Sequence, residues 1–305
     1  MAGHSHSHST SGYANHRKAL ITVLSMTAGV LVFEVIGAWL SGSLALLADA
    51  GHVFTDSAGL VLALIGATLV TRPETNARTW GFRRIEVLAA AGQALLLLGV
   101  GTFVIVEAVR RFFDPQDVDP VFMIGFGVIG LVANLVSMMI LLKIENGNLN
   151  MRAALLEVIN DALGSVSVVV AGIIIATTGW APADSVVSII IGSLIFPRSW
   201  KLLRETVHVL MESTPKNMDL DVLRAHIVKR DGVTAVHDLH ASLVGTDLPV
   251  VSAHVAVTDE MFTNGKLPAL LTEIQECLHG HFDVEHSTIQ FEPEGHRSSE
   301  HAAHP

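Results

Sequence analysis

The chain has 305 residues, of which 50% are hydrophobic and only 16% are charged, and its mean hydropathy is +0.50. Soluble proteins of this length carry more charge, so part of the chain is expected inside a membrane. The net charge of −10 argues against nucleic acid as a partner, because no basic stripe could neutralise phosphates. Cys277 is the only cysteine, which excludes an intrachain disulfide and a cysteine-based zinc site.

The polarity of the sequence divides the chain into four segments. We predict a polar tail at 1–18, a transmembrane domain at 19–205, a soluble domain at 206–293 and a flexible tail at 294–305. The first tail is histidine-rich, and such a tract is typical of loose metal capture, although a segment without a role, or part of a tag, is the alternative. The candidate residues for metal capture are His4, His6 and His8.

Five stretches of the transmembrane segment reach the ~20 mostly apolar residues that cross a bilayer. A sixth, Asp184–Pro197, reaches this length only if its helix continues through Arg198, Lys201 and Arg204 at the membrane surface. The other five are Ala19–Leu40, Leu44–Val70, Ile85–Val109, Pro120–Leu142 and Met151–Thr178.

Lysine and arginine residues predict how the spans are oriented, because they are enriched on the cytoplasmic side of a membrane. Eleven lie on one side of the predicted spans, and only Arg110 and Arg111 lie on the other. This imbalance requires an even number of crossings. We therefore expect six spans, with both termini in the cytoplasm. The eleven are Arg17, Lys18, Arg72, Arg78, Arg83, Arg84, Lys143, Arg152, Arg198, Lys201 and Arg204.

The soluble segment alternates between helical and strand patterns in the order αββαβ. This order predicts a small α+β domain, with helices on one face of a three-stranded sheet, as in ferredoxin-like and metallochaperone-like folds. The predicted helices are Leu220–Lys229 and Leu267–His279, and the predicted strands are Val233–Val244, Pro249–Thr258 and Ser287–Glu292.

Ionisable side chains inside two of the spans indicate a functional site. Each costs roughly 2.5–3.5 kcal/mol at the centre of a bilayer, so such residues are retained for a reason. The second span carries Asp49, His52 and Asp56, and the fifth carries Glu157 and Asp161. His52 and Asp56 are four residues apart, as are Glu157 and Asp161, so each pair projects from one face of its helix. Asp49 lies one turn before His52 on the same face.

The second and fifth spans are expected to run in opposite directions and to place both pairs near the middle of the membrane. Together the pairs can supply four ligands, which is the usual number for Zn²⁺. A structural hydrogen-bonding cluster is the alternative. However, three or more carboxylates cannot stay ionised together in a low dielectric without a cation or a proton. The residues therefore favour a cation site.

Other classes of membrane protein fit the sequence less well. An intramembrane zinc hydrolase needs an open metal position and a general base, commonly in an H-E-x-x-H motif, which the sequence lacks. A sodium/proton antiporter needs only carboxylates, and His52 argues against it. A metal sensor that signals without transport remains an alternative.

Seven motifs, in order along the chain, resemble those of the cation diffusion facilitator family, and most closely the bacterial zinc, cadmium and cobalt exporters of the CzcD type. The resemblance covers nearly all of the chain from Lys18 to Pro293. The motifs are SGSLALLADAGHVFTD (Ser41–Asp56), RTWGFRRIEVLA (Arg78–Ala89), VEAVRRF (Val106–Phe112), NMRAALLEVINDALGS (Asn150–Ser165), GVTAVHDL (Gly232–Leu239), SAHVAV (Ser252–Val257) and TIQFEP (Thr288–Pro293).

The resemblance implies a homodimer in the bacterial inner membrane that exports Zn²⁺, and also Cd²⁺ or Co²⁺, in exchange for protons by alternating access. It implies that His52, Asp56 and Asp161 are metal ligands. Glu157 stands where zinc-transporting relatives usually have histidine. Three carboxylates and one imidazole make a harder site, which tolerates Mn²⁺, Fe²⁺ or Co²⁺ relatively better. An exporter preferring Mn²⁺ or Fe²⁺ is therefore the second hypothesis within the family.

The resemblance also implies that residues 206–293 are a cytoplasmic metal-binding dimerisation domain. Its metal positions match His237, His254 and Glu292, while Gln290 replaces a further family histidine. His240 and His286 are nearby candidates.

Overall fold

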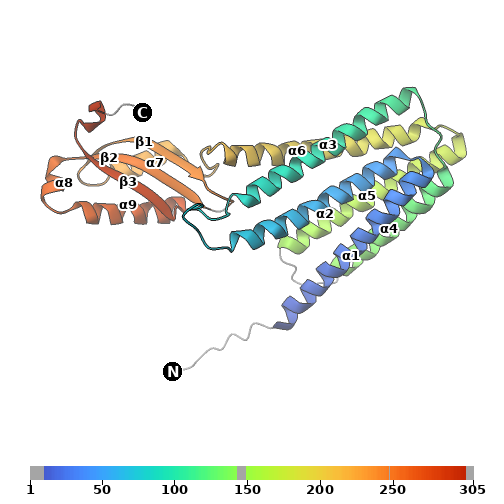
Figure 1. The fold of residues 1–305 in the computed structure, drawn as a ribbon, viewed down its shortest axis with the longest axis horizontal. Helices are drawn as coiled ribbons and strands as arrows, with labels where there is room; N and C mark the ends of the chain where they lie inside the picture. Colours follow the sequence, from blue (N-terminus) through green and yellow to red (C-terminus); the bar gives the residue numbers. More distant parts are fainter. Residues whose placement is uncertain (1–9, 143–148, 247, 300–305) are drawn as a thin grey trace. The chain divides into compact units, whose positions relative to one another are not determined.

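The computed structural model describes residues 10–142, 149–246 and 248–299, with six long helices followed by a small α+β domain (Figure 1). The chain forms two compact units, one made of residues 1–61 and 92–201 and the other of residues 62–91 and 202–305. His4, His6 and His8 lie outside the described residues. The long helices are α1 (Thr10–Ser41), α2 (Leu44–Val70), α3 (Ile85–Phe113), α4 (Pro120–Leu142), α5 (Leu149–Thr178) and α6 (Pro182–Leu210).

The helices α2 to α6 are each long and apolar enough to cross a membrane, and the described part of α1 contributes the apolar stretch Ser25–Ser41. The predicted membrane bundle is therefore confirmed. The helix α6 continues through Pro197 to Leu210, so the sixth stretch does extend past Arg198, as its prediction required. The helix α1 begins at Thr10, within the segment that was predicted as a tail.

Small residues let the helix α4 approach its neighbours α1 and α5 closely. A Cβ atom at Gly37 of α1 would overlap with the ring of Phe126 on α4. A Cβ at Gly127 of α4 would lie 3.0 Å from a methyl group of Val169 on α5. Close packing of this kind holds helices together where lipid replaces water.

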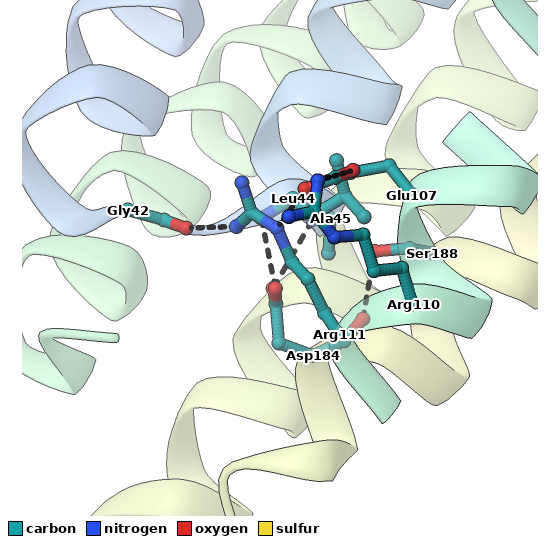
Figure 2. A network of polar contacts seen from close by, with 8 residues as sticks. All are labelled: Gly42, Leu44, Ala45, Glu107, Arg110, Arg111, Asp184 and Ser188. Carbon is teal, nitrogen blue, oxygen red and sulfur yellow. Dashed lines mark hydrogen bonds and ion pairs between the residues drawn. The ribbon is translucent and has the colours of Figure 1, made fainter. Parts of the chain in front are cut away.

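A buried carboxylate at the start of α6 fixes one end of this unit (Figure 2). Asp184, 2% exposed, accepts hydrogen bonds from the Ser43 hydroxyl at 2.6 Å and from the backbone N–H groups of Leu44 and Ala45 at 2.8 and 3.1 Å. These N–H groups begin α2 and have no partner within that helix. The negative charge of Asp184 also complements the helix dipole at this point.

A basic side chain of α3 holds the same turn (Figure 2). Arg111 donates a hydrogen bond to the carbonyl oxygen of Gly42 at 2.8 Å and pairs with Glu107 of its own helix at 3.0 Å. Gly42 has a φ of +71°, a conformation that glycine adopts without strain. The turn between α1 and α2 is thus tied to both α3 and α6.

The second unit contains the sheet of the small domain, in the strand order β1-β2-β3. The strands β1 and β2 are antiparallel, whereas β2 and β3 are parallel and connected through α9. Leu223 of α7 and Ile274 of α9 are fully buried in its core. The elements are α7 (Leu220–Val228), β1 (Val233–Leu243), β2 (Pro249–Val257), α8 (Asp259–Thr263), α9 (Leu267–Phe282) and β3 (His286–Pro293).

The predicted order αββαβ is confirmed, with one addition. The helix α8 was not predicted, because its five residues are too few to show a helical period.

Replacing Asp184 by asparagine is expected to destabilise the membrane unit by about 1.5–3 kcal/mol, the range for a hydrogen bond to a charged group. The amide presents N–H groups where the carboxylate accepted them, so a donor at the start of α2 loses its partner. Thermal unfolding of the full chain in detergent measures the change. Asp114→Asn, at an exposed position, is the matched control. An unchanged unfolding temperature for Asp184→Asn would show that these hydrogen bonds contribute nothing to the stability of the membrane unit.

Candidate metal centres

The helices α2 and α5 bring three of the predicted ligands together. His52 Nε2 lies 3.5 Å from an oxygen of Asp56 on the same helix and 4.0 Å from an oxygen of Asp161 on α5. One ligand atom from each of the three lies within 4.8 Å of the others, a separation that one metal ion could bridge. Asp56 and Asp161 are buried, with exposures of 7% and 4%. The four-residue spacing that suggested a shared face on α2 therefore corresponds to a real cluster.

Several polar atoms of this cluster lack hydrogen-bond partners, which is typical of a cation-binding site. Both oxygens of Asp56, Oδ1 of Asp161 and Nδ1 of His52 are buried, and none has a hydrogen-bond partner among the described residues. Buried carboxylate oxygens without a donor are strongly unfavourable unless a cation or a proton reaches them. One imidazole and two carboxylates are also ligands that divalent transition metals accept.

A cavity of about 260 Å³ adjoins the cluster. Its walls come from α2, α3, α5 and α6, and they combine apolar side chains with a few polar ones. The polar and charged side chains of its lining include Asp49, His52, Asp56, Asn160 and Arg198.

Glu157, the fourth predicted ligand, lies beside the carboxyl group of Asp56 and also faces an arginine. Its Oε1 lies 3.6 Å from Nη2 of Arg198 on α6. Within the described residues, the three-ligand group does not include Glu157. Arg198 was expected on the sixth helix, but its pairing with Glu157 could not be predicted, because the spacing of residues along α5 does not show which residue of another helix faces them.

Asp49, the predicted accessory residue, belongs to a polar layer beside the cluster. It is 2% exposed and accepts a hydrogen bond from the Ser165 hydroxyl of α5 at 3.4 Å. The Ser165 hydroxyl in turn lies 3.5 Å from the side-chain nitrogen of Asn134 on α4. Asp49 is not one of the residues whose ligand atoms group with those of His52.

Glu34 of α1, which was not among the predicted site residues, is only 1% exposed. A Cβ at Gly130 would lie 3.0 Å from the Glu34 carboxyl and 3.2 Å from the Ser165 hydroxyl, so Glu34 reaches the same polar layer. A Cβ at Gly164 would overlap with the Asp49 carboxylate. Glycines on α4 and α5 thus leave room for the buried carboxyl groups. The sequence feature that could have identified Glu34 is a single glutamate inside an otherwise apolar span.

The sheet of the second unit places another three predicted ligands side by side. The register pairs His237 of β1 with His254 of β2, and Glu292 lies on the adjacent strand β3. The two oxygens of Glu292 lie 3.2 Å from His237 Nε2 and 2.8 Å from His254 Nδ1. His237 and Glu292 are each 2% exposed, and the ligand atoms of all three residues lie within 4.8 Å of one another. Gln290 donates a hydrogen bond to Glu292 at 2.7 Å.

Asp238 is a neighbour of this group that sequence analysis missed. It has a φ of +49° at an irregularity of β1, so its side chain leaves the regular alternation of the strand. Its carboxylate lies 3.2 Å from His240 Nε2 and 3.7 Å from His254 Nε2. His240 is therefore near the group through Asp238. His286 instead packs edge-on against Trp80, with ring centroids 4.8 Å apart, at the other end of β3 from Glu292.

Comparison with known proteins agrees with this architecture. Residues 20–211 match the cation efflux transmembrane domain, and residues 215–294 match the cytoplasmic domain of cation efflux proteins. The zinc transporter ZitB of Escherichia coli is 40% identical over 293 residues, covering 95% of this chain and 92% of the relative. The metal cation efflux system protein CzcD of Cupriavidus metallidurans is 38% identical over 95% of this chain and 90% of its own length.

A third relative is nearly as similar. The cadmium, cobalt and zinc/H(+)-K(+) antiporter of Bacillus subtilis is 36% identical over 96% of this chain and 93% of the relative. The chain belongs to the cation efflux family, the cation diffusion facilitators, which are membrane transporters of metal ions and not enzymes. The matched cytoplasmic domain is a dimer domain of this family, which supports the predicted homodimer.

Proposed function

We propose that this protein exports divalent metal ions from the cytoplasm, with Zn²⁺ as the first candidate and Cd²⁺ and Co²⁺ as further substrates. The observation that carries the proposal is the buried group of His52, Asp56 and Asp161 between two apolar helices. The E. coli relative is named a zinc transporter, and the B. subtilis relative is named for cadmium, cobalt and zinc. Both names support the choice of metals.

Exchange with protons follows from the chemistry of the ligands. A metal binds the deprotonated forms of carboxylate and imidazole, so its affinity falls as the pH falls. Metal from the cytoplasm then displaces protons from the group, and protons from outside displace the metal once the helices have opened the site to the other side. The B. subtilis relative carries H(+) in its name, which supports this coupling.

The orientation and the domain boundaries belong to the same proposal. We place both termini in the cytoplasm of a bacterial cell, because Lys and Arg residues predominate on the side where the chain begins and ends. The segments 1–18, 19–205, 206–293 and 294–305 then act as tail, membrane domain, cytoplasmic dimer domain and second tail. His4, His6 and His8 would capture metal in front of the transport site.

The group in the cytoplasmic domain is proposed as a second metal site of His237, His254 and Glu292. Its support is the proximity of three ligand atoms on adjacent strands. Asp238 and His240 are near enough to assist, whereas His286 is engaged with Trp80.

Asparagine in place of Asp56 or Asp161 is expected to reduce metal uptake into proteoliposomes to background, at least about tenfold, because removing a charged partner from a buried group is strongly unfavourable. Uptake of Zn²⁺ driven by a pH gradient measures the effect. Asp117→Asn, at an exposed position, should leave uptake unchanged. Transport retained by both site variants would remove these residues from the ligand set. A protein that binds metal but produces no flux would instead be a sensor.

Histidine in place of Glu157 is expected to shift selectivity toward Zn²⁺ and away from Mn²⁺, by roughly tenfold in the ratio of the two. An imidazole is a softer ligand than a carboxylate, and a softer site discriminates against Mn²⁺. Competition between the two metals in the same vesicles measures the ratio. An unchanged ratio would show that Glu157 does not contact the transported ion, whereas a wild type that already prefers Mn²⁺ or Fe²⁺ would favour the second hypothesis.

Glutamine in place of Glu292 is expected to remove the metal held by the cytoplasmic domain, because Glu292 is the residue that contacts both histidines. The number of Zn²⁺ ions bound per purified chain should fall, while the intramembrane ion is retained. Glu294→Gln, two residues further and exposed, is the matched control. Equal metal content in both variants would argue against this second site.

A further inference from the structure

A positively charged side chain reaches the edge of the intramembrane site. Within the described residues, Arg198 is the lysine or arginine that lines the 260 Å³ cavity next to His52 and Asp56. Its guanidinium lies 3.6 Å from the carboxylate of Glu157, one helical turn before Asp161 on α5. The pair therefore joins α6 to the helix that supplies one of the candidate metal ligands.

The charges of the four predicted membrane ligands do not match a divalent ion. When His52 is neutral, Asp56, Glu157 and Asp161 together carry three negative charges, so a bound divalent ion leaves one in excess. Arg198 removes this excess by pairing with Glu157. The charge of the divalent ion is then balanced by Asp56 and Asp161 alone.

We propose that Arg198 is a positioning residue of the transport site, which competes with the metal ion for the carboxylate of Glu157. While Arg198 holds Glu157, the ion meets three ligands, and its affinity is lower than four ligands would give. A transporter must release its ion on the far side of the membrane, and binding that is too tight would trap it. Arg198 thus sets the affinity at a level that permits release. This inference rests on the proposed metal export.

The inference predicts opposite effects on binding and turnover. Arg198→Gln should bind Zn²⁺ roughly tenfold more tightly, because Glu157 is then free to join the other ligands. The same variant should transport with a lower KM and a lower kcat. Arg198→Lys keeps the charge and should behave like the wild type. Lys201→Gln removes a charge three residues further on α6 and should change neither quantity.

A double-mutant cycle separates this role from a structural one. Zn²⁺ affinity is measured on the full chain in detergent, with Glu292→Gln in every variant to silence the cytoplasmic group. In the background of Glu157→Gln, the further change Arg198→Gln should no longer tighten binding. Tightening that persists without Glu157, or unchanged or weaker binding in Arg198→Gln, would overturn the inference. Should Arg198→Gln fail to fold, loss of wild-type affinity in Arg198→Lys would overturn it as well.

A further variant tests the proposed transport site separately from the role of Arg198. His52→Ala should abolish binding at the membrane site. Unaltered Zn²⁺ binding in His52→Ala would contradict the proposed transport site itself. When His52→Ala does lose binding and the cycle shows no coupling between Arg198 and Glu157, only the role of Arg198 is wrong.

Discussion

The cost of placing charged groups among apolar helices governs the membrane unit. Glu34, Asp49, Asp56 and Asp161 are all at most 7% exposed, yet they lie in helices that are otherwise apolar. Each of these carboxyl groups would be unfavourable alone. Their presence in one region means that hydrogen-bond donors, protons or cations must compensate for them, and the fold supplies only part of this compensation. The Ser165 hydroxyl donates a hydrogen bond to Asp49, whereas the oxygens of Asp56 have no such donor among the described residues.

The same principle appears in a different form in the small domain. There the sheet, and not a helical period, brings the groups together, because His237 and His254 are paired across two strands and Glu292 lies on the third. Glu292 is buried, but Gln290 donates a hydrogen bond to it and both histidines contact it. Only Oε1 of Glu292 is satisfied in this way, because its Oε2 has no hydrogen-bond partner among the described residues. Both groups therefore keep at least one buried carboxylate oxygen that a cation or a proton could compensate.

Much of the architecture follows from local patterns in the sequence. The six apolar stretches and the αββαβ order depend on hydrophobic periods, which are properties of neighbouring residues. The clustering of His52 with Asp56 also follows from a spacing of four. Contacts that depend on a third helix could not be predicted from the sequence. Arg198 on α6 contacts Glu157, and Glu34 reaches the polar layer from α1. Asp238 was missed because a left-handed residue interrupts the strand alternation on which the prediction relied.

The hydrogen bonds that Asp184 accepts have a mechanical consequence for alternating access. Three hydrogen bonds join the first residues of α2 to the beginning of α6, so these two helices cannot separate at that end without losing all three. Any rocking of the bundle must then pivot there, and the travel of α2 relative to α6 must grow toward their opposite ends. His52, two turns into α2, lies nearer to this tied end than to the far end of the helix, so it would move less than the residues around Val70.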